Sequence, residues 1–133
     1  MTPKFRAWLK NDKEIIDVDE IHWFDGELDI IGDYITFVRK ADEIELMQST
    51  GLKDKNGKEI FEGDIVKRYR SPFFKAKWEY LIETVIKEKA SLLLGREFGK
   101  NFGTIPFNSP FAKSDLLEVI GNIYENPELL EVE

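Results

Sequence analysis

The residues best suited to binding a ligand lie together in one short segment, residues 67 to 78, which reads KRYRSPFFKAKW. It holds five basic and four aromatic residues in twelve positions. Basic side chains neutralise phosphates and exposed rings stack on unpaired bases, so this mixture is typical of single-strand nucleic-acid binding. It also suits a protein–protein patch, where aromatic anchors are enriched. The candidate binding residues are Lys67, Arg68, Tyr69, Arg70, Phe73, Phe74, Lys75, Lys77 and Trp78.

A structural role for the same segment competes with both interpretations. Its four aromatic side chains can pack inward while the lysines and arginines solvate a strand and its loop. The net charge of −7 weakens long-range attraction to nucleic acid. The structural role is therefore favoured over nucleic-acid binding. The binding hypothesis requires that Lys67, Arg68, Arg70, Lys75 and Lys77 form one exposed face.

Charge is distributed unevenly along the chain. Residues 1–46 hold 6 basic and 12 acidic side chains, residues 47–114 hold 13 and 8, and residues 115–133 hold 6 acidic side chains and no basic one. A basic middle and acidic ends predict contacts between copies, or with another protein, that weaken as salt is added.

Metal and catalytic sites lack the residues that they need. An EF-hand loop starting at Asp17 would place Ile21 and His22 where an oxygen ligand and a glycine are required. His22 is the single histidine and cysteine is absent, which leaves zinc without its usual ligands. No serine stands in a nucleophile elbow, and the glycines from Gly95 to Gly103 lack the spacing of a phosphate loop. We predict no catalytic residue, no metal and no cofactor, and a protein that is not an enzyme.

The expected compartment follows from three further features. The absence of cysteine suits a reducing environment. No apolar run approaches the roughly 20 residues that span a membrane, and the first residues lack the apolar core of a signal peptide. We expect a cytoplasmic protein with no membrane partner.

The elements that must position these residues are mainly strands. Asp25-Gly26 is a strong two-residue hairpin signal between two short apolar runs. The first third of the chain is therefore predicted to be a β-meander, with residues 42–47 either a short strand or one helical turn. Its strands are expected at Phe5–Leu9, Ile15–Val18, Glu20–Phe24, Glu27–Ile31 and Tyr34–Val38.

The sequence after residue 46 predicts a second group of strands. Asn56-Gly57 suits a type I′ turn, and residues 47–66 are expected to form a compact loop with very short strands. Trp78–Glu88 fits either a strand or an amphipathic helix, and we favour the strand. Asn126-Pro127-Glu128 predicts the start of a short final helix. Strands are expected at Ile65–Arg70, Trp78–Glu88, Ala90–Leu94 and Leu116–Tyr124.

Three segments closely resemble the YopX family of small proteins encoded by bacteriophages and prophages. They are FRAW at Phe5–Trp8, GLKDKNGKEIFEGDIV at Gly51–Val66 and VIGNIYENPELL at Val119–Leu130, in that order along the chain. The resemblance implies a β-rich fold whose second half is similar to an SH3-like barrel, and a phage or prophage origin. It implies no catalytic residue.

The expected protein is thus mainly β, with an acidic β-meander lobe at residues 1–46, an SH3-like barrel lobe at residues 47–133 and a short C-terminal helix. The two lobes are expected to form one compact unit. We expect it to act in the cytoplasm of a bacterial host by binding a protein partner or by self-association into a homo-oligomer. The alternative is single-stranded nucleic-acid binding through residues 67–78.

Overall fold

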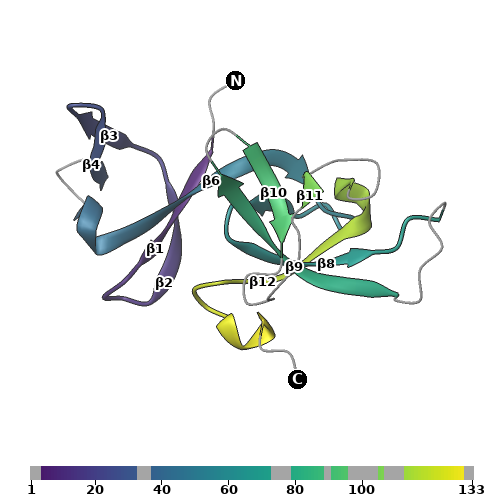
Figure 1. The fold of residues 1–133 in the computed structure, drawn as a ribbon. Coiled ribbons are helices and arrows are strands. Elements are labelled where there is room, and N and C mark those ends of the chain that lie inside the picture. Colours follow the sequence, from purple (N-terminus) through teal and green to yellow (C-terminus); the bar gives the residue numbers. More distant parts are fainter. Residues whose placement is uncertain are drawn as a thin grey trace. The chain divides into compact units, whose positions relative to one another are not determined.

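The computed structural model describes residues 4–32, 37–72, 79–88, 91–95, 105–106 and 113–130. The described chain is built almost entirely of β-strands joined by short turns (Figure 1), so the predicted mainly β class is confirmed. It divides into two compact units, Met1–Ser49 (unit 1) and Thr50–Glu133 (unit 2). In the described ranges no helix is both long and apolar enough to cross a membrane.

Unit 1 contains antiparallel strands in two groups. Strand β1 pairs with β2 on one side and with the first half of β6 on the other, and β3, β4 and β5 form a separate three-stranded sheet. The elements are β1 (Phe5–Leu9), β2 (Glu14–Val18), β3 (Ile21–Phe24), β4 (Glu27–Gly32), β5 (Val38–Lys40), the 3-10 helix η1 (Ala41–Glu43) and β6 (Ile44–Lys53).

Alternating apolar residues explain why these strands fold. Ala7, Leu9, Ile31 and Ile44 are buried together, because side chains two residues apart on a strand point to the same face. The β3–β4 connection is the two-residue turn predicted at Asp25-Gly26, and both residues have positive φ, 54° and 81°. A type I′ turn requires this conformation and suits the twist of a hairpin.

Unit 2 contains a curled five-stranded antiparallel sheet in the order β11-β10-β9-β8-β12, and β7 is the neighbour of β6. The segment that fitted either a strand or a helix is the strand β9. The elements are β7 (Glu59–Phe61), β8 (Asp64–Tyr69), β9 (Tyr80–Glu88), β10 (Ser91–Gly95), β11 (Ile105–Pro106), the 3-10 helix η2 (Ser114–Leu116), β12 (Leu117–Asn122) and the 3-10 helix η3 (Pro127–Leu130).

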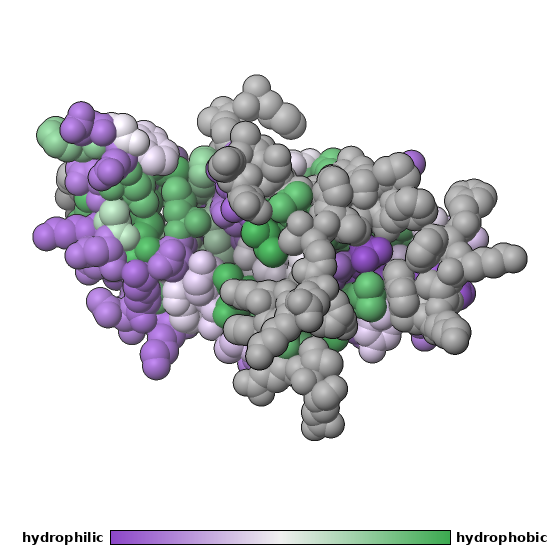
Figure 2. All heavy atoms as spheres, in the orientation of Figure 1, coloured by the Kyte–Doolittle hydropathy of each residue, from purple (hydrophilic) through white to green (hydrophobic). Residues whose placement is uncertain are grey.

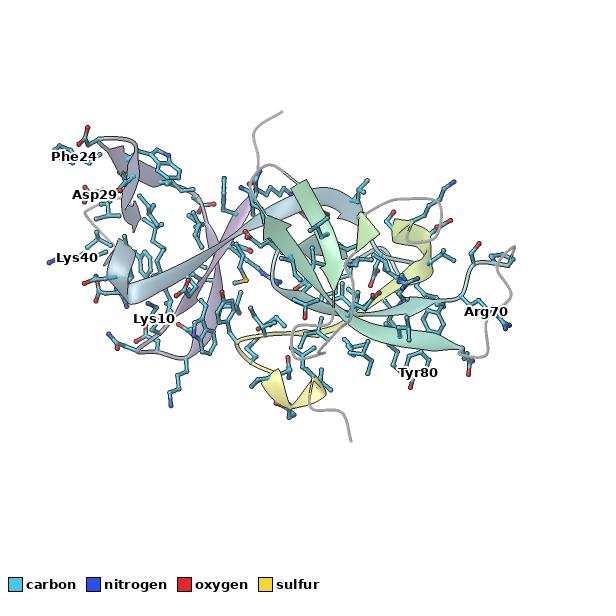
Figure 3. All side chains as sticks on the ribbon, in the orientation of Figure 1. Lys10, Phe24, Asp29, Lys40, Arg70 and Tyr80 are labelled. Atoms are coloured by element: carbon cyan, nitrogen blue, oxygen red, sulfur yellow. The ribbon has the colours of Figure 1, made fainter. Side chains whose placement is uncertain are left out.

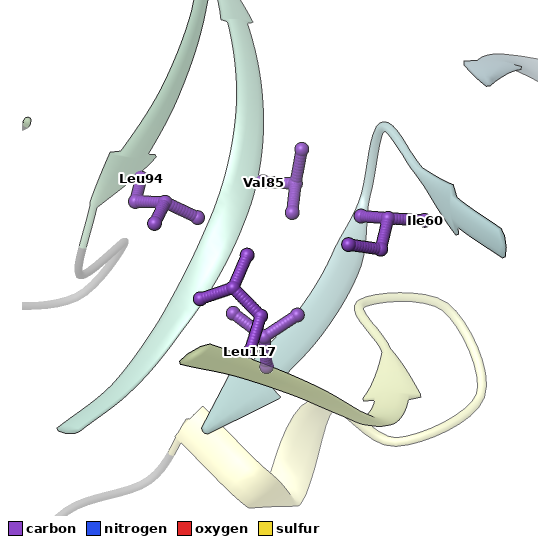
Figure 4. Close-up of a cluster of buried hydrophobic side chains, with 5 residues drawn as sticks. Ile60, Val85, Leu94 and Leu117 are labelled. Carbon is purple, nitrogen blue, oxygen red and sulfur yellow. The ribbon is translucent and has the colours of Figure 1, made fainter. Parts of the chain in front are cut away.

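The core of unit 2 lies on the concave side of this sheet. Ile60, Val66, Val85, Leu94 and Leu117 come from five different strands and are each at most 1% exposed. Their side chains converge in Figure 4. Burying a side chain of this size contributes about 1.5–3 kcal/mol, so these contacts supply much of the driving force that folds unit 2.

Most strands match the expected ranges to within one or two residues, and larger differences occur at β5 and β6. Residues 47–53 belong to β6, because the strand continues into the segment that we expected to be a loop and pairs with β7. Residues 42–47 hold both expected alternatives in succession, the end of η1 and the start of β6. Strand β5 begins only at Val38, and residues 34–36 of the expected Tyr34–Val38 strand lie outside the described residues.

Asp54 holds the turn around Asn56-Gly57 and ties it to β12. Its Oδ1 accepts hydrogen bonds from the amides of Asn56 and Lys58, both at 2.9 Å, and its Oδ2 accepts one from the Val119 amide at 2.8 Å. The side chain is only 6% exposed. Burial alone would raise the pKa of Asp54, but the amide hydrogen bonds favour the charged form and hold the pKa below its usual value.

Candidate binding surface

Strand β8 contains three of the predicted binding residues, Lys67, Arg68 and Tyr69, and their side chains point to opposite faces of the sheet. Lys67 and Tyr69 are two residues apart and share the outer face, whereas Arg68 lies between them and points inward. The antiparallel register places Tyr69 opposite Tyr80 on β9, and Lys67 opposite Glu118 on β12. Residues distant in sequence are thereby brought beside Lys67 and Tyr69.

Arg68 forms an ion pair inside unit 2. Its Nε donates to Glu83 Oε1 at 2.5 Å and its Nη2 to Glu83 Oε2 at 3.4 Å, and the two side chains are only 9% and 5% exposed. The expectation that Lys67, Arg68 and Arg70 share one exposed face is therefore wrong for Arg68. The physical reason is strand alternation, which turns Arg68 toward the interior of unit 2 and its neighbours Lys67 and Tyr69 toward the opposite face.

The outer face instead holds two tyrosines and two lysines, the tyrosine–lysine surface (Lys55, Lys67, Tyr69 and Tyr80). The tyrosine rings are 5.8 Å apart between centroids and inclined at 56°. Lys55 Nζ lies 4.3 Å from the Tyr69 centroid, and Lys67 Nζ lies 4.5 Å from the Tyr80 centroid. Each pair is in cation–π range, so each ammonium group helps to orient a ring.

Glu118 places a negative charge beside this surface. Its Oε1 accepts a hydrogen bond from Tyr69 Oη at 2.9 Å, and its Oε2 accepts one from Asn56 Nδ2 at 3.4 Å. The hydrogen bond to Glu118 raises the pKa of the Tyr69 phenol above its usual value, because ionisation would remove the donated proton and bring two negative charges together.

A Glu118→Gln variant is therefore expected to ionise Tyr69 at a lower pH than the wild-type protein does. The change removes the carboxylate acceptor and its charge, which are the main causes of the raised pKa. Tyrosinate absorbance followed during an alkaline titration measures the shift, and a Tyr69→Phe variant identifies the contribution of Tyr69. Glu27→Gln, on an exposed carboxylate in unit 1, is the matched control. Identical titrations of the Glu118→Gln and wild-type proteins would contradict this role of Glu118.

The other predicted binding residues divide into two groups. Arg70 is exposed at the end of β8, where its amide donates to the Glu79 carbonyl at 3.1 Å, and Figure 3 shows it in the same part of unit 2 as Tyr80. Phe73, Phe74, Lys75, Lys77 and Trp78 lie outside the described residues, so the structure leaves their part of the hypothesis untested.

Sequence reasoning missed two members of the tyrosine–lysine surface, Lys55 and Tyr80. A signal for Tyr80 was available. Ser71-Pro72 separates the predicted strands Ile65–Arg70 and Trp78–Glu88, and consecutive strands often pair with each other. Lys55 gave no comparable signal. It reaches Tyr69 because its amide donates to the Leu117 carbonyl at 2.9 Å, which fastens the 54–58 turn to β12.

His22 is half-buried in β3, and its Nε2 lies 3.1 Å from the Gly32 carbonyl oxygen and 3.4 Å from Glu20 Oε2. Over the described residues there is no group of three or more His, Asp or Glu side chains placed to hold a metal ion. The glycines Gly99 and Gly103, weighed against a phosphate loop, lie outside the described residues.

Comparison with protein families decides the relationship of the chain. The model of the YopX protein family matches residues 4–131, nearly the whole length. The chain belongs to the YopX family. The crystal structure of protein EF1440 from Enterococcus faecalis is similar over 98% of this chain and 99% of that one, with 31% identity and a TM-score of 0.65. No curated protein matches the chain.

In this YopX protein, two of the segments that carry the resemblance meet in space. The Asp54 carboxylate accepts from the Val119 amide, and the Ile123 amide donates to the Gly63 carbonyl at 3.0 Å. Asn122 is buried, and its Oδ1 accepts from the amides of Tyr124 and Glu125 at 3.0 and 2.8 Å. These distinctive residues of 51–66 and 119–130 therefore stabilise turns, and the tyrosine–lysine surface is the better candidate for binding.

Proposed function

We propose that this YopX protein is a non-enzymatic module that binds a protein partner or assembles with itself. Its origin would be a phage or prophage, and it would act in the cytoplasm of the bacterial host. The observation that carries the proposal is the pair of tyrosine rings flanked by two lysines on one face of the sheet. Tyrosine offers a large, rigid contact area at a low entropy cost, which makes it frequent at interfaces.

The chemistry of the other polar groups supports a role without catalysis. The Arg68 and Glu83 side chains neutralise each other in the interior, and Asp54 has its carboxylate oxygens occupied by backbone amides. Each of these groups stabilises the fold. The side chains of the tyrosine–lysine surface are exposed or half-buried, and they suit recognition of an acidic partner.

A Tyr80→Ala variant is expected to bind the partner about thirtyfold more weakly, which corresponds to about 2 kcal/mol for an interfacial aromatic anchor. The partner is first isolated from phage-infected or prophage-carrying cells with tagged wild-type protein, and its affinity for each variant is then measured by titration calorimetry. Lys53→Ala, an exposed cation on β6, is the matched control and should bind normally. Equal affinity of Tyr80→Ala and wild-type protein would contradict the assignment to this surface.

Single-stranded nucleic acid is the second candidate, because tyrosine rings beside lysines can also stack bases and contact phosphates. The net charge of −7 disfavours it, because it weakens long-range attraction to a polyanion. Gel shifts with single-stranded DNA and RNA at low salt separate the two. A shift that disappears with Tyr69→Ala or Lys67→Ala, and that falls steeply with added salt, would move the assignment to nucleic acid.

A further inference from the structure

The tip of the β3–β4 hairpin presents two adjacent aromatic side chains to solvent. Trp23 is 58% exposed and Phe24 is 75% exposed. Figure 3 shows Phe24 at the end of the hairpin, where the chain enters the Asp25-Gly26 turn. Trp23 and Phe24 are consecutive on β3 and therefore point to opposite faces of the hairpin, and covering either ring would remove a large apolar area from water. The hairpin tip is therefore a candidate anchor.

The surroundings of this anchor are strongly acidic. Asp25, Glu27 and Asp29 are exposed on the same hairpin, and residues 14–38 contain eight acidic residues and no lysine or arginine. Figure 2 shows hydrophilic side chains beside hydrophobic ones on the face of unit 1 in view. A partner that covers the tip must therefore combine apolar or aromatic contacts with positive charge.

Two copies of the hairpin do not meet this requirement. A symmetric contact between them would place Asp25, Glu27 and Asp29 of one copy against the same residues of the other, and like charges across an interface are unfavourable. A contact between two different surfaces of the chain avoids this repulsion. The described part of unit 2 offers aromatic rings and ammonium groups together on the tyrosine–lysine surface.

We propose that the Trp23–Phe24 tip of one copy docks on the tyrosine–lysine surface of a second copy. An exposed aromatic ring of the tip packs against Tyr69 and Tyr80, and the lysines turn toward the hairpin carboxylates. The interface is heterologous, so a bound pair still offers one free tip and one free surface, and assembly continues to a ring or a filament. This inference rests on the proposed function and names the partner for its self-assembling form.

Complementation between two variants tests the docking. The tip variant carries Trp23→Ser and Phe24→Ser, and the surface variant carries Lys67→Glu and Tyr80→Ser. The wild-type mass by multi-angle light scattering should rise with concentration and fall with added salt. Each variant alone should remain monomeric, because its association is at least about tenfold weaker. An equal mixture should form dimers and nothing larger, since one intact tip meets one intact surface. Circular dichroism verifies that each variant is folded.

Every other outcome overturns the docking. A tip variant that associates like wild-type protein shows that another surface mediates assembly, and the proposed self-association survives. Two monomeric variants that do not pair also contradict the contact. A wild-type protein that is monomeric at all salt concentrations excludes self-assembly, and the affinity of Tyr80→Ala for a separate partner then decides the proposed function. Val38→Ser is the control, because Val38 is 40% exposed in unit 1 and lies on β5, outside the hairpin tip.

Discussion

A Glu83→Ala variant is expected to lose about 3–5 kcal/mol of the free energy of unfolding. The substitution removes the carboxylate that lies 2.5 and 3.4 Å from the Arg68 guanidinium, and it leaves that buried cation in an interior that solvates charge poorly. Urea unfolding followed by circular dichroism measures the loss. A change below about 1 kcal/mol would contradict a structural role for the ion pair.

Two comparisons make the Glu83 experiment specific. Replacing both Arg68 and Glu83 by leucine should cost less than Glu83→Ala alone, because the charge and its partner disappear together. Lys53→Ala removes a cation from the exposed surface of β6 and should change stability by less than about 0.5 kcal/mol. A double variant as unstable as Glu83→Ala would show that packing, rather than charge, dominates at this position.

An Asp54→Ala variant is expected to lose about 3 kcal/mol, the second largest effect. Three backbone amides, those of Asn56, Lys58 and Val119, lose their acceptor, and each buried unsatisfied donor costs about 1–3 kcal/mol before the turn relaxes. Asp54→Asn should lose less, because its single amide oxygen can still accept from two of the three donors. Asp115→Ala removes an exposed carboxylate in the same unit and is the control.

The Asp54 contribution should also depend on pH. The lowered pKa means that the folded protein binds a proton at Asp54 less readily than the unfolded chain does. The stabilisation is therefore fully present above about pH 4, near the pKa of about 3.9 of an unfolded aspartate, and is lost as pH falls through the lower folded value. The stability difference between wild-type protein and Asp54→Asn should shrink over that acid range. A difference that grows on acidification would contradict this role.

Much of the fold was predictable from local sequence signals. Asp25-Gly26 marked the β3–β4 hairpin, because this pair accepts positive φ at both turn positions. Alternation in Tyr80, Ile82 and Thr84 indicated a strand, and β9 is one. The continuation of β6 through Lys53 was missed, since its pairing depends on neighbours that local chemistry does not reveal.

The candidate site was predicted only in part. Composition singled out Lys67, Arg68 and Tyr69 as basic and aromatic residues of one segment and treated the three as equivalent. Arg68 is buried because β8 alternates between two faces and Glu83 lies on the inner face of β9. Which alternate residues of a strand face the core can be decided only when the face of the sheet that packs on the core is known.

The sequence by itself determined the mainly β class, the hairpin turn and the resemblance to the YopX family, because these depend on residue types at fixed short spacings. Only the tertiary structure decided which basic residues are exposed and that Lys55, Tyr69, Tyr80 and Glu118 meet on one face. These residues come from a turn and three strands of unit 2, and their proximity is set by strand register across long stretches of chain. The candidate binding surface is therefore a property of the folded sheet.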